Sequence, residues 1–299
     1  MSKTLIVIGG PTAIGKTTLA IQLAQHFHTE IISADSRQFY REMVIGTAKP
    51  SEEELKAAKH HFINSHSIHD NFNAGDYEKE AIQLIDGLFK THDYLILAGG
   101  SGLFINAVVN GFDDLPAASV EARAALNDVL KSKGLQHLQE MLKEADPVYY
   151  SEVDINNPRR IIRALEVYET TGKPFSVFRN NNARPRPFRI VKIGLNTDRS
   201  KLYENINSRV DKMIRDGLVE EAEALLAYRN SNSLNTVGYS ELFDYFDGKY
   251  SLPEAVEMIK QNTRRFAKRQ LTWFNKSDDI KWFEPDELDK ILSYLKYYP

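Results

Sequence analysis

The sequence contains no cysteine among its 299 residues. This absence excludes disulfide bonds, zinc sites built on thiolates and cysteine nucleophiles, and it is typical of proteins of a reducing compartment. The sequence also lacks any apolar run near the roughly 18 to 20 residues that a membrane-spanning helix needs. An apolar strand pattern follows directly after Met-Ser-Lys, which leaves no room for a signal peptide. We therefore expect a cytoplasmic protein that does not enter a membrane.

An excess of charge of either sign is also missing. The net charge is only −3, and the hydrophobic fraction of 42% and the charged fraction of 26% are those of an ordinary globular protein. Without a global excess of basic residues, any binding of nucleic acid must come from local clusters. The length suits one large domain or two modest ones with a sizeable core.

Eight residues form a phosphate-binding motif directly after the first apolar run. They fit the pattern G-x-x-x-x-G-K-[ST] and are Gly10, Pro11, Thr12, Ala13, Ile14, Gly15, Lys16 and Thr17. In this motif the glycines let backbone N–H groups turn toward a phosphate, the lysine adds a positive charge and the hydroxyl binds Mg²⁺. A glycine turn used only for packing would leave Lys16 and Thr17 unexplained. We expect a bound phosphate here, although the loop alone identifies neither the ligand nor the reaction.

The first part of the chain alternates strand and helix patterns. Strands are predicted at residues 4–8, 30–35 and 94–98, and helices at residues 18–27, 77–90 and 103–109. This order predicts an α/β fold, a P-loop-type parallel sheet core with helices on both faces. The ligand of such a sheet lies at the carboxyl ends of its strands.

The pattern changes after residue 111. Residues 116–187 hold six of the eleven prolines, and helices are predicted at residues 120–133, 135–145 and 158–170. Residues 189–195 then predict a strand that returns to the sheet, followed by helices at residues 201–215, 218–227 and 252–273. We assign residues 1–114 and 188–299 to a P-loop catalytic core and residues 115–187 to an all-helical insertion domain.

An acid that ATPases and kinases of this loop class use to hold Mg²⁺ is missing from the third predicted strand, which ends in Gly99-Gly100-Ser101-Gly102. Asp35 instead follows the second predicted strand, where a carboxylate suits a general base. Capping a turn or holding the water shell of Mg²⁺ are alternative roles for Asp35. The glycine turn with Ser101 suits either a contact to a second phosphate or a tight strand-to-helix connection.

Basic residues cluster in two places. Residues 260–276 carry six lysines and arginines without an acid, and Arg159, Arg160 and Arg163 share one predicted helix. Each cluster suits either a nucleic-acid backbone or a solvated helix face, and their location in separate domains suggests a clamp around RNA. Arg184, Arg186 and Arg189 stand beside prolines and predict a solvated linker.

Four histidines, at positions 60, 61, 66 and 69, fall within ten residues. A metal site is conceivable, but no acid or cysteine accompanies them at zinc spacing. We therefore favour ordinary histidines in a loop.

Seven motifs in order carry a resemblance over essentially the whole chain. They are the phosphate loop, Ser33-Ala34-Asp35-Ser36-Arg37-Gln38-Phe39-Tyr40, Ile45-Gly46-Thr47-Ala48-Lys49-Pro50, Gly99-Gly100-Ser101-Gly102-Leu103-Phe104, Asn157-Pro158-Arg159-Arg160-Ile161-Ile162-Arg163-Ala164-Leu165-Glu166, Val237-Gly238-Tyr239, and the run from Arg264 to Phe274. With these motifs the sequence resembles the bacterial tRNA dimethylallyltransferases, also called isopentenyl transferases.

The resemblance implies transfer of a prenyl group. Members of that family move the dimethylallyl group of dimethylallyl diphosphate onto N6 of the adenosine just 3′ of the anticodon and release diphosphate, with Mg²⁺. By this resemblance Lys16 and Thr17 serve the diphosphate and its metal, Asp35 takes the amine proton and Ser101 lies at the bridging oxygen. Arg209 matches the arginine that clamps the diphosphate.

The resemblance also implies which residues contact tRNA. The matching positions are Asp35, Ser36, Arg37, Gln38, Arg123, Arg159, Arg160, Ile161, Ile162, Arg163, Gly238 and Tyr239. Ile14 replaces a small serine common in the family loop, Phe104 replaces a frequent tyrosine, and Arg37 and Gln38 differ from an alanine-leucine version of their segment. None of these departures removes a reacting group.

Three other functions compete with this one. A P-loop kinase for a small metabolite would use ATP as donor and Asp35 as base, and an adenylate isopentenyltransferase would prenylate free AMP or ADP. An RNA-binding switch would use nucleotide binding only for control. The missing strand-end acid counts against the kinase, and the basic clusters favour a polynucleotide substrate. We expect a monomer that binds tRNA, dimethylallyl diphosphate and Mg²⁺.

Overall fold

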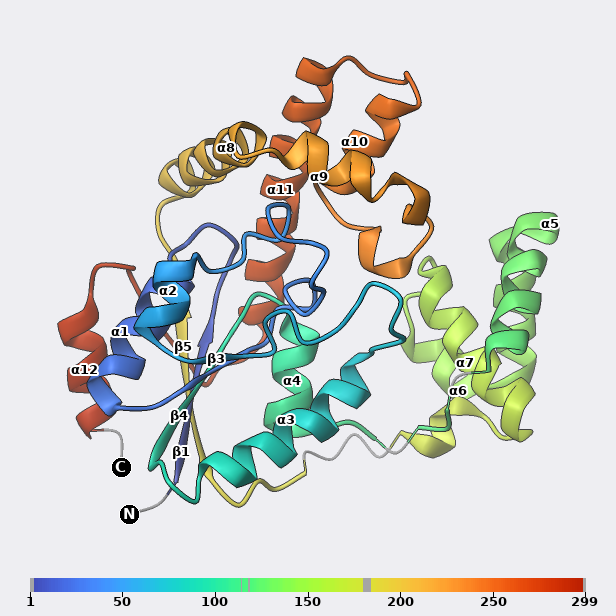
Figure 1. Cartoon of the computed structure of the whole chain (residues 1–299). Helices are drawn as coiled ribbons and strands as arrows, with labels where there is room; N and C mark the ends of the chain where they lie inside the picture. Colours follow the sequence, from blue (N-terminus) through green and yellow to red (C-terminus); the bar gives the residue numbers. More distant parts are fainter. Residues whose placement is uncertain (1–2, 114, 118, 180–183, 298–299) are drawn as a thin grey trace. The chain divides into compact units, whose positions relative to one another are not determined.

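The computed structural model describes residues 3–113, 115–117, 119–179 and 184–297. In this part of the chain, six parallel strands form one sheet in the order β3-β2-β4-β1-β5-β6 (Figure 1). The strands are β1 (Thr4–Gly9), β2 (Ile31–Ser33), β3 (His60–His61), β4 (Tyr94–Ala98), β5 (Arg189–Leu195) and β6 (Ile280–Phe283). The predicted α/β class with a parallel sheet is confirmed.

Strand β1 lies in the middle of the sheet and is buried on both faces. Leu5 and Val7 belong to the apolar cluster on one face, while Ile6 and Ile8 belong to the cluster on the other. Successive side chains of a strand alternate between faces, so a continuous apolar run is what a doubly covered strand requires. This position places the segment after β1 at the centre of the carboxyl edge of the sheet.

Helices cover both faces of the sheet (Figure 1). Helices α1 (Lys16–Phe27), α8 (Arg199–Arg215) and α12 (Leu288–Tyr297) contribute to one apolar cluster, and α3 (Ala74–Leu88) and α4 (Gly102–Asn110) contribute to the other. A third cluster joins Met43, Leu218, Tyr239 and Ile259, which come from the segment after β2 and from α9 (Leu218–Ala224), α10 (Tyr239–Phe246) and α11 (Leu252–Phe274). The core unit also contains the short helix α2 (Glu52–Ala57).

The chain divides into two compact units. One consists of Met1–Val109 with Arg186–Pro299, and the other of Asn110–Pro185. Our sequence-based assignment put the limits of the insertion at 115 and 187, and residue 114, beside the first limit, lies outside the described residues. The smaller unit contains α5 (Val120–Ala145), α6 (Pro147–Glu152) and α7 (Pro158–Thr171) around its own apolar cluster.

The helices predicted at residues 120–133 and 135–145 are confirmed as the two helical segments of α5, which meet at a non-helical residue, Gly134, with φ 81°. Strands β3 and β6 were not predicted, because β3 consists of two histidines and β6 is mostly half-exposed. None of the described helices is both long enough and apolar enough to cross a lipid bilayer.

Candidate functional site

The phosphate loop connects β1 to α1 at the carboxyl edge of the sheet. Gly10 has φ 143° and Gly15 has φ 98°, which are conformations that favour glycine. A Cβ atom at Gly10 would also lie only 2.6 Å from the carbonyl oxygen of Leu195. The loop therefore depends on these glycines for its shape, and the N-terminus of α1 follows it as an anion-binding end.

Lys16 lies over the phosphate loop. Its Nζ atom donates hydrogen bonds to the carbonyl oxygens of Gly10 (3.0 Å) and Pro11 (2.6 Å). Burial lowers the pKa of Lys16 to about 7, the Asp35 carboxylate opposes this change and the Arg209 guanidinium adds to it. Lys16, Asp35 and Arg209, which come from α1, from the segment after β2 and from α8, therefore lie within electrostatic reach of one another.

Arg209 also contacts the phosphate loop directly. Its Nη1 atom donates a hydrogen bond to Thr12 Oγ1 at 3.2 Å. Burial lowers the pKa of Arg209, and the Asp35 carboxylate opposes that change. A guanidinium fixed at the rim of a phosphate loop is well suited to a multiply charged anion, because it presents several donors in a rigid plane.

Asp35 follows β2 by two residues. Its Oδ1 atom accepts a hydrogen bond from the backbone N–H of Arg37 at 3.0 Å, which closes a turn. The described residues provide no donor to Asp35 Oδ2. One oxygen thus holds the local backbone, while the other is available as a proton acceptor, so the turn-capping and general-base roles are compatible.

Ser101 is positioned by the glycine turn after β4. Its Oγ atom accepts a hydrogen bond from Ser36 N at 3.0 Å and donates one to Ser36 Oγ at 3.1 Å. A Cβ atom at Gly99 would lie 2.3 Å from the carbonyl oxygen of Ala34. The turn therefore packs directly on the backbone that leads into Asp35, and Ser101 lies beside the neighbour of that carboxylate.

Thr17 lies in the first turn of α1 and is half-buried. Its hydroxyl makes no hydrogen bond with any described residue. An unpartnered hydroxyl beside a phosphate loop fits the oxygen ligands that Mg²⁺ prefers. Thr17 thus remains a suitable metal ligand.

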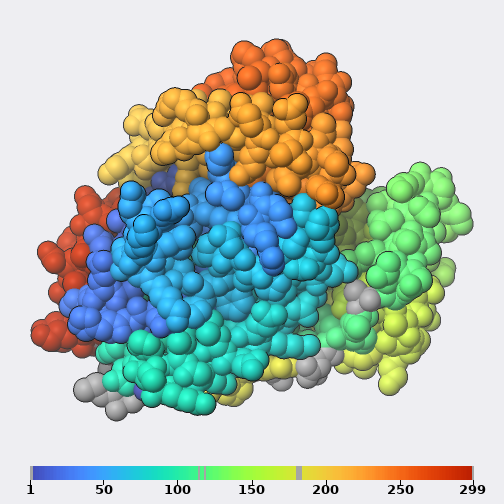
Figure 2. Space-filling model, in the orientation of Figure 1, coloured from blue at the N-terminus to red at the C-terminus, as the bar shows by residue number. Residues whose placement is uncertain are grey.

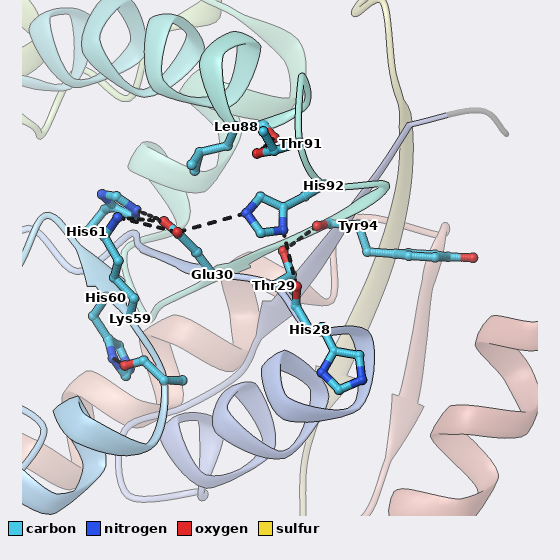
Figure 3. A network of polar contacts seen from close by, with 11 residues as sticks. His28, Thr29, Glu30, Lys59, His60, His61, Leu88, Thr91, His92 and Tyr94 are labelled. Carbon is cyan, nitrogen blue, oxygen red and sulfur yellow. Dashed lines mark hydrogen bonds and ion pairs between the residues drawn. The ribbon is translucent and has the colours of Figure 1, made fainter.

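The four clustered histidines do not gather around a common point. His61 Nε2 lies 2.5 Å from Glu30 Oε2 at the opposite, amino end of β2 (Figure 3). His66 stacks on Phe72, and His69 contacts the edge of the Tyr228 ring. Among the described residues no group of three or more histidines and acids could hold a metal ion.

Two residues predicted to contact tRNA brace the site from inside the core unit. Arg37 donates hydrogen bonds to the carbonyl oxygens of Asn232 (3.1 Å) and Asn235 (3.3 Å). Gln38 Nε2 donates to the carbonyl oxygens of Thr47 (3.3 Å) and Ala48 (3.1 Å). These contacts fix the segment that contains Asp35 and Ser36 to two other loops.

Glu221 holds a third such connection, which the sequence did not reveal. Its carboxylate accepts hydrogen bonds from the backbone N–H groups of Val44 (3.0 Å), Ile45 (2.8 Å) and Gly46 (2.9 Å), and from the Tyr239 hydroxyl (2.6 Å). In Figure 2 the gold and orange surface of α9 and its neighbours lies against the light-blue surface of this segment. Three consecutive backbone donors bound to one carboxylate hold the segment in one conformation.

Tyr239, another residue predicted to contact tRNA, is fully buried against Gly46. Gly238, its neighbour, has φ 102° and starts α10. The Tyr239 ring therefore positions the segment around Gly46, and a contact of this motif with a ligand would involve its backbone or its neighbours.

In the insertion unit, two predicted tRNA contacts are held by one buried acid. Glu166 is fully buried, and its Oε2 atom pairs with Arg123 Nη2 at 2.8 Å and with Arg163 Nη1 at 3.3 Å. Arg163 also donates to the carbonyl oxygen of Pro116 at 2.8 Å. Glu166 Oε1 has no hydrogen-bond partner in the described structure.

The other predicted contacts of α7 divide between surface and core. Arg159 and Arg160 are exposed, whereas Ile161 and Ile162 are buried in the apolar cluster of the insertion unit. A ligand on this helix can reach the two arginines directly, while the isoleucines hold the helix in place.

The basic helix α11 is partly engaged within the protein. Lys260 pairs with Asp211 at 2.8 Å, and Arg264 donates a hydrogen bond to Asn207 at 2.6 Å. Arg265, Lys268 and Arg269 are exposed. The helix therefore combines packing on α8 with a basic surface.

Comparison with known proteins places this site in a family. The family model described as IPP transferase matches residues 38–277. The chain is 54% identical over 297 residues to the tRNA dimethylallyltransferase of Christiangramia forsetii, covering 99% of this chain and 98% of that protein. It is 50% identical over 300 residues to the tRNA dimethylallyltransferase of Flavobacterium johnsoniae, covering 98% and 97%.

Solved structures agree with these relatives. The full-length tRNA isopentenylpyrophosphate transferase of Bacillus halodurans superposes with a TM-score of 0.72 at 38% identity, covering 99% of this chain and 95% of that one. A eukaryotic dimethylallyltransferase acting on tRNA superposes with a TM-score of 0.79 at 26% identity, covering 97% of this chain and 75% of that one.

Proposed function

The chain belongs to the IPP transferase family, and on this basis we propose that it is a tRNA dimethylallyltransferase. It transfers the dimethylallyl group of dimethylallyl diphosphate to N6 of the adenosine directly 3′ of the anticodon in tRNA, and it releases diphosphate. The observation that carries this proposal is the convergence of Lys16, Asp35 and Arg209 at one phosphate loop. Two cations suit a departing diphosphate, and the carboxylate suits an incoming amine.

The phosphate loop, with Lys16 and Arg209, holds the diphosphate of the donor. In the reaction the bond between C1 of the allyl group and the bridging oxygen breaks, and a bond between C1 and N6 forms. Negative charge grows on the departing diphosphate, so fixed donors and cations around it stabilise the transition state more than the ground state. Ser101, beside Ser36, supplies a hydroxyl for the bridging oxygen.

Asp35 accepts the proton that N6 loses. The exocyclic amine of adenine is a weak nucleophile, and a positioned carboxylate typically contributes 10²–10⁴-fold to such a proton transfer. The adenosine must leave its base stack to reach a loop-lined site, as other enzymes that modify bases require. Arg159 and Arg160 of the insertion unit offer exposed cations for the tRNA backbone.

Thr17 is the residue that would hold Mg²⁺, together with the diphosphate oxygens. When bound, the ion would add positive charge at the leaving group. We further propose that the protein acts as a monomer in the cytoplasm.

The test incubates the purified protein with dimethylallyl diphosphate, Mg²⁺ and unmodified tRNA, followed by mass analysis of the nucleosides. We expect one prenylated adenosine per tRNA and one diphosphate released, with no product from AMP or ADP and no tRNA-independent turnover of ATP. Product from AMP or ADP would identify an adenylate isopentenyltransferase, and ATP turnover a kinase.

Asp35→Ala tests the mechanism within the same assay. We expect a loss of at least about 100-fold in kcat with diphosphate binding retained, because the base is removed and the phosphate loop is not. Asp86→Ala, which removes an exposed carboxylate of α3, is the matched control and should remain fully active. Full activity of Asp35→Ala would contradict the assignment of the base.

A further inference from the structure

Gln270 connects the two glycine-rich turns of the site, although its helix lies far from both turns in the sequence. It belongs to α11 and is only 6% exposed. Its Oε1 atom accepts a hydrogen bond from the backbone N–H of Thr12 at 2.9 Å, and its Nε2 atom donates one to the carbonyl oxygen of Gly100 at 2.8 Å. One side chain thus bridges the phosphate loop after β1 and the turn after β4.

The chemistry of this bridge requires an amide. Only a side chain that accepts at one atom and donates at the next satisfies both backbone groups. A glutamate in the same place could accept from Thr12 but would set a second acceptor against the carbonyl oxygen of Gly100. An apolar side chain would leave a backbone N–H and a carbonyl without partners in a buried place, which is costly.

The sequence of the turn is adapted to the same contact. A Cβ atom at Gly100 would lie 2.4 Å from Gln270 Nε2, so any other residue there would displace the amide. The neighbouring residues of α11 are seated in the same way, because Trp273 packs against Gly102 and Phe274 against Gly9. The end of α11 therefore packs on Gly9 at the end of β1, on Gly100 in the second turn and on Gly102 at the start of α4.

The two backbone groups that Gln270 joins belong to turns that serve two different parts of the reaction. Thr12, on one side, accepts the hydrogen bond from Arg209. Gly100, on the other side, directly precedes Ser101, whose hydroxyl is bonded to Ser36 beside Asp35. A change in the separation of the turns would therefore shift the diphosphate grip relative to the Ser101 and Asp35 side of the site.

We propose that Gln270 is a positioning residue that sets the separation between the phosphate loop and the Ser101 turn. It does not touch the substrate; it keeps the groups that hold the leaving diphosphate in register with those that serve the bridging oxygen and the amine. The inference rests on the proposed prenyl transfer, because it assigns both turns to one reaction.

The test measures steady-state prenyl transfer by Gln270→Glu and by Gly100→Ala, which disturbs the bridge from its other end without changing a polar side chain. For each we expect kcat to fall by roughly 30- to 100-fold, the loss that a misplacement of about 1 Å produces. The KM for tRNA should stay within about threefold, because no residue that contacts tRNA is changed. The kcat of the double variant should lie within about threefold of the kcat of the slower single variant, since both changes break the same bridge.

Ile291→Val serves as the control for a purely structural effect. It removes one methylene from the apolar cluster at α12, changes none of the three residues of the bridge and lowers the melting temperature. Its kcat should equal that of the wild type. Should Gln270→Glu not fold, Gly100→Ala and Gln270→Met give the same comparison.

An unchanged kcat in a folded Gln270→Glu or Gly100→Ala protein would overturn the proposal, as would a loss confined to KM. Independent, multiplicative losses in the double variant would also overturn it. A wild-type protein that fails to prenylate tRNA contradicts the proposed function itself, so the two failures are distinguishable.

Discussion

Lys16 shows how a single residue of the site is prepared for an anion. It is enclosed by carbonyl oxygens of its own loop, and burial brings its pKa to about 7. A multiply charged ligand in the loop would favour its charged form, since an opposite charge within a few ångströms stabilises an ammonium group. The position thus couples the charge of one side chain to occupancy of the loop.

Replacement of this lysine should weaken both binding and turnover. We expect Lys16→Ala to reduce diphosphate affinity by roughly 10- to 100-fold, which corresponds to the loss of a charge-assisted hydrogen bond of about 1.5–3 kcal/mol. Titration calorimetry with diphosphate measures the binding, and the prenylation assay measures turnover. Lys201→Ala, an exposed lysine of α8, is the control. Unchanged diphosphate affinity in Lys16→Ala would contradict the role of the loop.

Glu30 gives a pH dependence that belongs to stability and not to catalysis. Its burial would raise the pKa of its carboxyl, but hydrogen bonds from His61 and Lys59 outweigh that effect and lower the pKa below its ordinary value of 4.5 (Figure 3). A carboxyl whose pKa is lowered by folding stabilises the folded state above its unfolded pKa. That contribution is lost as the pH falls below 4.5 through the folded pKa.

Glu30→Gln should therefore be less stable than the wild type at pH 7, by about 1 kcal/mol, because its partners lose a charged acceptor. The difference should disappear progressively below pH 4.5. Urea unfolding at a series of pH values measures it, and prenyl transfer at pH 7 should be retained. A difference that stays constant from pH 7 to pH 3 would show that the ion pair does not contribute.

The residues of the site differ in how far the sequence could reveal them. Lys16 and Thr17 were predictable because a local motif fixes both their identity and their surroundings. Asp35 was predictable from its place after a strand. Gln270 lies in the last of the seven motifs, but its role was not predictable, because its partners stand 258 and 170 positions away in the sequence.

Whole strands and helices, like single residues, were predictable where a local sequence pattern marks them. Strand β5 was predicted with its observed limits, because its run Ile190-Val191-Lys192-Ile193-Gly194-Leu195 is mostly apolar and rich in β-branched residues. Strand β3 has no such run and exists only because Ile31 and Ile32 of β2 provide a parallel partner. The sequence predicted two helices that meet at Gly134. Whether a glycine interrupts a helix or ends it depends on the helical pattern of its neighbours.

Helix α9 contributes to the site through Glu221. Replacement of this glutamate tests how the helix orders the segment around Gly46. We expect Glu221→Ala to lower stability by about 2 kcal/mol, because it leaves the backbone N–H groups of Val44, Ile45 and Gly46 without their acceptor. The KM for tRNA should rise while diphosphate affinity stays near that of the wild type, since the phosphate loop is untouched.

Hydrogen exchange at residues 44–46 provides the direct measurement, and it should accelerate in Glu221→Ala. Glu220→Ala is the control, because Glu220 is the exposed neighbour of Glu221 on the same helix. Protected amides at residues 44–46 in Glu221→Ala would show that the carboxylate is not what orders this segment.

At the scale of the whole molecule, the insertion unit is a separate compact body with its own apolar cluster. The core unit contains the two chain segments between which the insertion is placed. Arg186 donates hydrogen bonds to the carbonyl oxygens of Ala107 (2.8 Å) and Val108 (2.8 Å), and it pairs with Glu78 at 2.9 Å. The prediction of a solvated linker was wrong for Arg186, because Glu78 and two carbonyl groups offer it a buried site.

This closure allows the insertion to be removed without opening the core. Because Arg186 bonds the backbone at Val108, a flexible linker of about five residues can replace residues 110–185. We expect the shortened protein to fold cooperatively and to bind diphosphate within about threefold of the wild type, since Lys16 and Arg209 lie in the core unit. Its affinity for tRNA should fall by at least about 10-fold, with a weaker dependence on salt, because the proposed phosphate contacts of Arg159 and Arg160 are lost. Filter binding of tRNA at several salt concentrations measures the effect, and Arg159→Ala with Arg160→Ala in the intact chain should reproduce part of it.

Unchanged tRNA affinity in the shortened protein would show that the core alone holds the RNA, and lost diphosphate binding would show that the core depends on the insertion.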